Sequence, residues 1–294
     1  MRKLTLLLFI SLFILPNLVL LVTAAPGEGT PKPDKTSPPI TILKTYSTPS
    51  PYPEGMAYDG KYVWSTSIQD DKIFKHDPIT GKVISYIKAP GEGPMDLAWD
   101  GKYLWNADYD TDKIYQLDTS GRIIKSFSTP GGQPMGMTWD GKYLWHTDYT
   151  LKKIYQMDTN GKIIKSFNAP GQKPHGLTWD GKYLWNADSI TYNIYKLDTN
   201  GKVLAKYYFP YSYPTGLALQ GDFLWMAARD TQKIYKMKLP LTTTTSKTGV
   251  ETTTDSKTTT QTPTIQTTTS TKTTAQTTQT GLADSPWPMF RGNL

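Results

Sequence analysis

A repeat of about 40 residues fills the middle of this 294-residue chain and limits its possible folds more than any other feature. Five segments with the pattern Pro-x-Gly, or a close variant of it, begin successive units. Their prolines are Pro53, Pro94, Pro134, Pro174 and Pro214. The first interval is one residue longer than the other three, which are equal. A fixed period of this size is typical of propellers and solenoids.

Each unit has the pattern of four short strands. In the third unit we predict strands at 136–139, 143–148, 153–158 and 162–167, which are rich in β-branched and aromatic residues. Asp-Gly and Asn-Gly pairs mark the tight turns between them, and this density of turns excludes helices. Four antiparallel strands within one such unit make a propeller blade.

Tryptophan recurs at two fixed places in the unit. A single blade cannot bury both of its faces, so neighbouring blades must stack, and aromatic columns of this kind predict packing between blades rather than ligand platforms. These columns are Trp105, Trp145, Trp185 and Trp225, and Trp99, Trp139 and Trp179.

The ends of the repeat array predict how the ring closes. The fifth unit supplies only three strands, at 216–218, 223–225 and 234–237. A segment before the first unit, 42–46, matches the fourth-strand pattern at 123–127 and can complete the last blade. Closure removes sheet edges that would invite aggregation. We therefore predict an all-β fold, a five-bladed β-propeller over residues 40–240.

The N-terminal segment predicts export. Residues 1–25 combine Arg2 and Lys3 with an apolar run and a small-residue ending, which is the pattern of a signal peptide. An uncleaved anchor is the alternative, and both place the chain outside the cytoplasm, secreted or at the cell surface. Residues 26–39 are rich in Pro and Gly, and we expect a stiff linker there.

The C-terminal part has the composition of a stalk. Threonine accounts for more than half of the segment from 242 to 280. Such a segment cannot bury enough apolar surface to order itself, so residues 241–284 are predicted to be a disordered spacer, either O-glycosylated or bare.

The composition excludes several kinds of reactive site and argues against nucleic acid as a partner. The chain has no cysteine, which excludes a disulfide scaffold, a thiol nucleophile and a cysteine zinc site. Residues 40–240 contain 24 Lys+Arg and 20 Asp+Glu, spread evenly, whereas nucleic-acid binding needs a clustered basic patch. We expect a monomer that binds an extracellular protein, peptide or glycan, and that meets a membrane only through an uncleaved anchor.

Variation between units is concentrated at one mouth of the channel. The Asp-Gly turns, with Lys61, Lys102, Lys142 and Lys182 beside their aspartates, predict a solvated rim of balanced charge. At the opposite rim, loop and strand-start positions differ from unit to unit, and binding residues concentrate on such positions. The predicted binding residues are Glu54, Met95, Asp96, Met135, His175, Thr215, Asn106 and Asn186.

Histidines and acids near this mouth allow a catalytic or metal-binding hypothesis. His175, His146 and Glu54 are the candidates for acid–base catalysis, and His146, His175 and Asp148 for a divalent metal ion. The alternative is structural: buried histidines, and aspartates that cap turns, as for Asp108, Asp148 and Asp188. The third histidine, His76, is predicted to lie at the surface.

Two motifs carry resemblances to known families. Residues 100–108, Asp-Gly-Lys-Tyr-Leu-Trp-Asn-Ala-Asp, resemble the blades of streptogramin-lyase-like propellers, which implies a metal-dependent lyase with a His/Glu catalytic set. Residues 52–60 resemble the opening motif of plant-type glutaminyl cyclases, which implies a five-bladed cyclotransferase. The catalytic glutamate of that family belongs to the second strand, where this chain has Trp64-Ser65-Thr66-Ser67.

A third resemblance concerns the last residues. The segment 285–293 is similar to the opening motif of pyrroloquinoline-quinone-type propeller domains. That motif normally introduces a second propeller, and we expect that a downstream domain was lost or is encoded separately. The leading functional hypothesis is an extracellular binding module. The alternative is a metal-dependent lyase or a cyclotransferase-like enzyme at the channel mouth.

Overall fold

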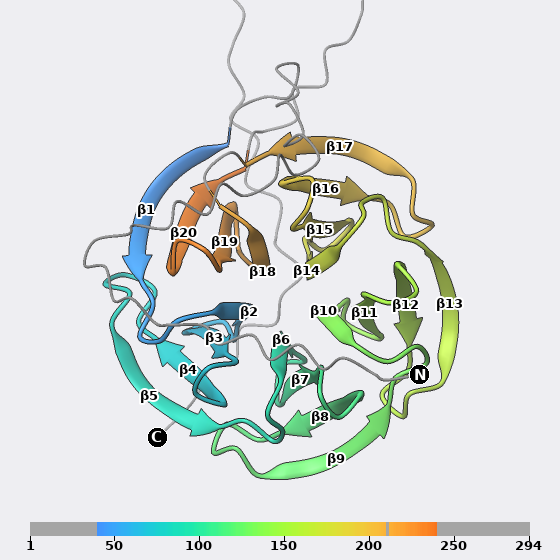
Figure 1. Cartoon of the computed structure of the whole chain (residues 1–294), viewed down its shortest axis with the longest axis horizontal. Coiled ribbons are helices and arrows are strands. Elements are labelled where there is room, and N and C mark those ends of the chain that lie inside the picture. Colours follow the sequence, from blue (N-terminus) through green and yellow to red (C-terminus); the bar gives the residue numbers. More distant parts are fainter. Residues whose placement is uncertain (1–39, 210–211, 240–294) are drawn as a thin grey trace, which may run out of the picture. The chain divides into compact units, whose positions relative to one another are not determined.

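The computed structural model describes residues 40–209 and 212–239, which form a ring of five four-stranded antiparallel sheets (Figure 1). The prediction of an all-β five-bladed propeller is confirmed. The predicted signal peptide, linker, stalk and final motif lie outside the described residues. Over the described ranges, no helix has the length and apolar character needed to cross a membrane.

The first four blades each use consecutive strands, ordered from the channel axis to the outer edge. Blade 1 contains β2 (Pro53–Tyr58), β3 (Val63–Ser67), β4 (Lys72–His76) and β5 (Val83–Lys88). Blade 2 contains β6 (Pro94–Trp99), β7 (Leu104–Asp108), β8 (Lys113–Leu117) and β9 (Ile123–Ser128). Blade 3 contains β10 (Pro134–Trp139), β11 (Leu144–Asp148), β12 (Lys153–Met157) and β13 (Ile163–Asn168). Blade 4 contains β14 (Pro174–Trp179), β15 (Leu184–Asp188), β16 (Asn193–Leu197) and β17 (Val203–Tyr208).

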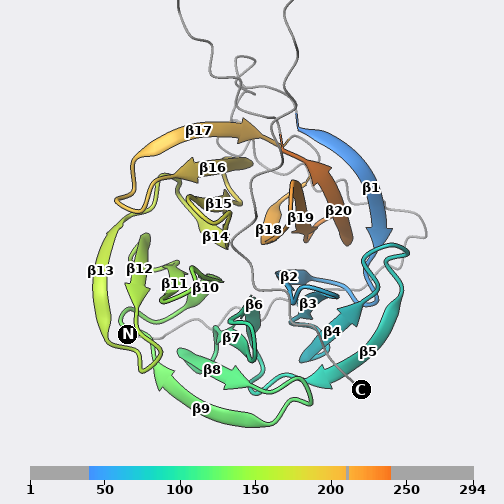
Figure 2. The same ribbon diagram turned by 180° about the vertical axis from the view of Figure 1, so that it is seen from behind.

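The fifth blade is shared between the two ends of the propeller. It consists of β18 (Pro214–Gln220), β19 (Phe223–Ala228), β20 (Lys233–Lys238) and the N-terminal strand β1 (Thr41–Ser47). Strand β1 pairs antiparallel with β20, with Tyr46 opposite Ile234 (Figure 2). The predicted closure by the N-terminal strand is therefore confirmed.

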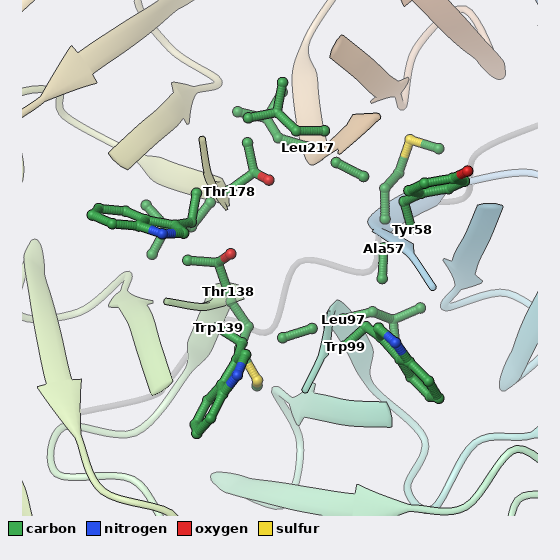
Figure 3. Close-up of a pocket in the computed structure, with 15 residues that line it drawn as sticks. Ala57, Tyr58, Leu97, Trp99, Thr138, Trp139, Thr178 and Leu217 are labelled. Carbon is green, nitrogen blue, oxygen red and sulfur yellow. The ribbon is translucent and has the colours of Figure 1, made fainter. Parts of the chain in front are cut away.

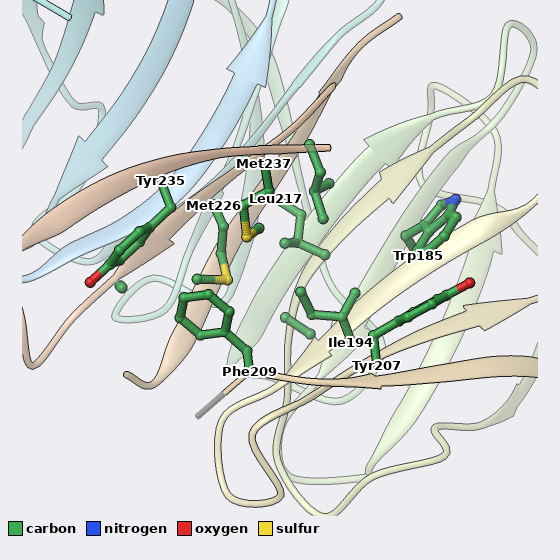
Figure 4. Packing of buried hydrophobic residues seen from close by; sticks show 11 residues of the cluster. Trp185, Ile194, Tyr207, Phe209, Leu217, Met226, Tyr235 and Met237 are labelled. Atoms are coloured by element: carbon green, nitrogen blue, oxygen red, sulfur yellow. The ribbon is translucent and has the colours of Figure 1, made fainter. Parts of the chain in front are cut away.

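Each junction between blades contains its own apolar cluster, and each cluster contains one second-strand tryptophan. Between blades 4 and 5, Trp185 and Ile194 pack with Leu217 and Met226 (Figure 4). These indoles are at most 2% exposed. Burying one indole, roughly 200 Å² at about 25 cal/mol per Å², stabilises the fold by about 5 kcal/mol before the loss of side-chain entropy. The prediction that the second-strand tryptophans pack between blades is confirmed.

The Asp-Gly turn supports this packing directly. In blade 2, Asp100 Oδ1 accepts the backbone N–H groups of Lys102 and Tyr103, at 2.9 and 2.7 Å. Its Oδ2 accepts the indole N–H of Trp105 at 2.7 Å. Blades 1, 3 and 4 repeat the arrangement, and Gln220 takes the place of the aspartate in blade 5. The aspartate thus fixes the turn and orients the buried indole.

Candidate functional site

The five innermost strands, β2, β6, β10, β14 and β18, surround the axis of the ring (Figure 1). We call the end of this channel that carries the Asp-Gly turns the turn end. The opposite end, which carries the connections between blades, is the connector end. The two ends hold different chemistry.

Asp96 occupies the axis of the channel. Its Oδ1 accepts the backbone N–H groups of Met56 and Leu97 at 2.8 and 2.9 Å. Its Oδ2 accepts those of Met137 and Leu177 at 2.8 and 3.3 Å. The carboxyl group therefore ties together four of the five innermost strands and is only 2% exposed.

The other blades have glycine at the position of Asp96, and the geometry explains why. A Cβ atom on Gly136 would lie 1.9 Å from the carbonyl oxygen of His175, and one on Gly216 would lie 2.5 Å from that of Glu54. The strands approach so closely that the axis has room for a single side chain. Burial raises the pKa of Asp96 well above its ordinary value, although the four N–H donors act to lower it. Because each carboxyl oxygen accepts two N–H groups, the hydrogen bonds by themselves favour the ionised form.

The connector end brings together two of the predicted catalytic residues. Glu54 from β2 and His175 from β14 face each other, with 3.7 Å between Oε2 and Nδ1. Arg229, in the loop after β19, lies with its guanidinium 3.2 Å from Glu54 Oε1 and stacks over the ring of Tyr52. Glu54 and His175 are 2% and 3% exposed, whereas the Arg229 side chain is 43% exposed.

Burial sets the protonation of this pair. It raises the pKa of Glu54 to about 7, against the lowering effect of the Arg229 and Lys173 charges. It lowers the pKa of His175 to about 3, and the same two cations add to that shift. At neutral pH the imidazole is uncharged and the carboxyl group is near its midpoint. Glu54 Oε2 and His175 Nε2 are buried without a hydrogen-bond partner among the described residues, and Glu54 Oε1 has only the ion pair with Arg229.

The other predicted mouth positions are buried as well. Met95 and Met135 are each 4% exposed, and Thr215 is 1% exposed. The Thr215 hydroxyl donates toward the carbonyl oxygens of Pro53 and Ala227, both at 3.0 Å, and so links blade 5 to blade 1.

Asn106 and Asn186 lie inside their blades. The Asn106 amide donates to the carbonyl oxygen of Asp96 at 3.1 Å, and the Asn186 amide donates to that of Gly176 at 3.1 Å. Neither side chain reaches the surface. In this structure they brace the innermost strand, so a ligand would reach them only if the strands moved.

His146 and Asp148 are also interior. The His146 ring stacks on Tyr155 with 5.2 Å between centroids, and burial lowers its pKa to about 4. Asp148 Oδ1 accepts the backbone N–H of Leu151 at 2.6 Å. The structure unites Glu54 with His175 and leaves His146 and Asp148 in blade 3. Across the described residues, no group of three or more His, Asp and Glu side chains is placed to hold a metal ion.

The prediction that His76 lies at the surface is wrong. Its side chain is 3% exposed, and its Nε2 atom is 2.8 Å from the hydroxyl oxygen of Ser65. Its Nδ1 is 3.3 Å from the carbonyl oxygen of Gly81, in the turn that follows its strand. The tight turn folds back over the imidazole, which the strand pattern alone did not indicate.

The turn end opens into a pocket of about 110 Å³ (Figure 3). Small side chains surround the axis there, and the hydroxyl groups of Thr138 and Thr178 turn toward it. Larger side chains form the wall: Tyr58, Trp99, Trp139, Trp179 and Leu219. Sequence reasoning assigned these tryptophans to packing alone. The missed signal was a small residue, Ala or Thr, that each innermost strand carries two positions after the glycine or Asp96 position. These small side chains leave space at the axis.

Comparison with known proteins identifies the fold. No family model matches the chain, and neither does any curated protein. A Myxococcus xanthus glutaminyl cyclase structure is similar over 68% of this chain and 98% of that chain, at 10% identity and a TM-score of 0.57. A Staphylococcus aureus virginiamycin B lyase structure with quinupristin covers 67% and 70%, at 25% identity and a TM-score of 0.44. A chain of the nidogen–laminin complex covers 64% and 76%, at 24% identity and a TM-score of 0.48. The resemblance to glutaminyl-cyclase propellers is confirmed as a resemblance of fold, at low sequence identity.

Proposed function

We propose that this protein is an extracellular binding module that recognises a peptide at the connector end of its channel. The observation that carries the proposal is the buried Glu54–His175 pair beside the exposed guanidinium of Arg229. Buried polar atoms normally have a partner, and Glu54 Oε2 and His175 Nε2 have no hydrogen-bond partner in the described part of the chain. The extracellular location rests on the signal-like pattern of residues 1–25.

The chemistry of this mouth suits an amide or a free amino group. A carboxylate accepts N–H groups, a guanidinium donates to carbonyl oxygens, and a neutral imidazole does either. A peptide terminus carries both kinds of group within a short distance. Arg229 would have to swing from Glu54 to admit it, and its partial exposure makes it the mobile part of the mouth.

The test is calorimetric titration of the full chain with short peptides that have a free or an acetylated amino terminus. We expect Glu54→Gln and Arg229→Gln each to weaken binding at least tenfold, which corresponds to about 1.4 kcal/mol. Glu92→Gln changes the charge equally at an exposed position and serves as the control. Unchanged affinity in both mouth variants would overturn the proposal.

A second candidate function is a cyclotransferase-like enzyme, favoured by the pKa of about 7 at Glu54. A general acid or base works best when its pKa lies near the working pH. The assay is cyclisation of an N-terminal glutaminyl peptide, followed by mass spectrometry. Glu54→Gln should slow it by about 100-fold or more if Glu54 transfers the proton. Absence of turnover by the unmodified chain would remove this candidate.

A further inference from the structure

A ring of lysine–tyrosine pairs lies at the turn end of the propeller. Four exposed lysines directly follow the Asp-Gly turns, and each places its ammonium group over the ring of the next residue, a tyrosine. The distances from Nζ to the ring centroid lie between 4.8 and 5.1 Å. The pairs are Lys61–Tyr62, Lys102–Tyr103, Lys142–Tyr143 and Lys182–Tyr183.

A second ring of lysines comes from the strands further out. Each places its ammonium group over the buried second-strand tryptophan of its blade, at 4.9 to 5.4 Å from the ring centroid. The members are Lys75, Lys125, Lys165, Lys196 and Lys236. Every blade thus presents at least one ammonium group on an aromatic face.

The sequence suggested that the aspartates of the Asp-Gly turns neutralise the lysines beside them, but their hydrogen bonds show otherwise. The carboxyl group of Asp140 accepts two backbone N–H groups of its own turn and the indole N–H of Trp145, and is directed into the blade. Asp59, Asp100 and Asp180 do the same in their blades. Among these four turns, the one ion pair with a lysine in the described residues joins Asp180 to Lys196, at 3.3 Å. The carboxyl groups of the Asp-Gly turns are engaged internally, and the four lysines that follow these turns are exposed. The outer lysines keep acidic neighbours, since Lys196 pairs with Asp180, and Asp158 and Asp198 act on Lys125 and Lys165.

We infer that the turn end is a docking surface for an acidic polysaccharide. The blades repeat with a fixed period, so their ammonium groups recur around the axis and match a ligand whose charges also repeat regularly. The face consists of turns rather than an open strand edge, so a peptide cannot dock there by adding a strand. The central pocket, with the Thr138 and Thr178 hydroxyls, offers hydrogen bonds to one sugar substituent. The aromatic rings hold the lysine stems in place, which lowers the entropic cost of binding.

Affinity electrophoresis and calorimetry of the full chain with polygalacturonate test this assignment, with neutral dextran as the reference polymer. We expect binding to polygalacturonate that weakens as sodium chloride is raised, and none to dextran. The fourfold variant K61Q, K102Q, K142Q and K182Q should bind at least tenfold more weakly. These side chains are exposed, so the variant should remain folded, with an unfolding transition shifted only by the loss of the four lysine–tyrosine contacts.

A matched variant supplies the control. The substitutions K113Q, K152Q, K153Q and K233Q remove the same charge from residues at, or directly before, the connector end of their strands. This variant should bind within twofold of the unmodified chain, and so should Glu54→Gln, which separates this surface from the proposed peptide site. If both fourfold variants weakened polygalacturonate binding equally, net charge alone would explain the binding and the assignment would be overturned. Equally tight binding of poly-L-glutamate would overturn the preference for a sugar polymer, and no binding to any polyanion would overturn the surface itself.

Discussion

The two ends of the channel are built from the same five strands and yet have opposite chemistry. The connector end buries Glu54 and His175, with Asp96 on the axis beside them. The turn end exposes ammonium groups on aromatic rings around an open pocket. The difference follows from the room available to each blade. At the axis only one side chain fits, so the repeat must be broken there, whereas at the rim each blade has its own sector and four of the five blades keep the same lysine–tyrosine pair.

The largest predicted effect tests the single side chain on the axis. In Asp96→Asn, the amide NH2 group replaces one carboxylate oxygen and faces N–H donors. Two buried N–H groups then lose their acceptor, at about 1–3 kcal/mol each, so we expect a loss of about 4 kcal/mol. Urea unfolding followed by tryptophan fluorescence measures it. A loss below about 1 kcal/mol would show that the carboxylate does not hold the ring together.

Moving the carboxylate to another blade sharpens the same test. Gly136 is the equivalent position in blade 3, and a Cβ atom there would lie 1.9 Å from the backbone carbonyl oxygen of His175 whether or not Asp96 is present. The double variant, Asp96→Gly with Gly136→Asp, should therefore recover none of the stability that Asp96→Gly alone loses. Gly136→Asp in the presence of Asp96 should prevent folding through the same backbone clash. Recovery of stability in the double variant would mean that the strands can shift and that the blades are interchangeable at the axis.

The second prediction uses the pH dependence of stability to test the buried Glu54 at the connector end. Between pH 4.5 and about 7 the unfolded chain has released the Glu54 proton and the folded chain has not, so the Glu54 contribution to stability falls as pH rises. At about 1.4 kcal/mol per pH unit, the loss reaches about 3 kcal/mol. Burial of His175 acts in the opposite direction, since its contribution rises from about pH 3 to 6.5.

Glu54→Gln removes only the first of these contributions. The stability of the variant relative to the unmodified chain should therefore increase by about 3 kcal/mol between pH 4.5 and pH 8. Urea unfolding of both proteins across this range gives the difference directly, because the histidine contributions cancel. A difference that does not change with pH would mean that Glu54 titrates as an ordinary carboxylate in the fold.

Sequence reasoning reached the architecture because packing repeats along the chain. The fixed period, the tryptophan columns and the missing fourth strand of the last unit each have a direct physical reading, and all three agree with the structure. The extra residue in the first interval has a place too, since the turn that contains Ile79 is one residue longer than its equivalents and leaves this side chain 71% exposed.

The chemistry of the two channel ends could not be predicted from the sequence, because it depends on contacts that only the structure reveals. Glu54 and His175 are far apart in the sequence and come from blades that are not neighbours, so spacing gave no sign that they meet. Counting charges along the chain cancelled Lys142 against Asp140, because only the hydrogen bonds reveal that the carboxylate points inward. Asp96 was recognisable as an exception among glycines, but its role depends on backbone N–H groups from four blades.

The smallest predicted effect comes from comparing two threonines of blade 3, one in the closed part of the channel and one at the open turn-end pocket. Thr147 accepts the backbone N–H of Gly136 at 2.7 Å and donates to the carbonyl oxygen of His175 at 3.0 Å. Thr138 turns its hydroxyl toward the open pocket (Figure 3). Thr147→Val should cost about 1–3 kcal/mol, because it leaves two buried backbone groups without a partner. Thr138→Val should stay within about 0.5 kcal/mol. Both substitutions replace a hydroxyl with a methyl group, so urea midpoints of the two variants compare the closed and open parts of the channel at constant shape. Equal losses of stability would mean that the Thr138 hydroxyl is as inaccessible to water as the strands around Asp96.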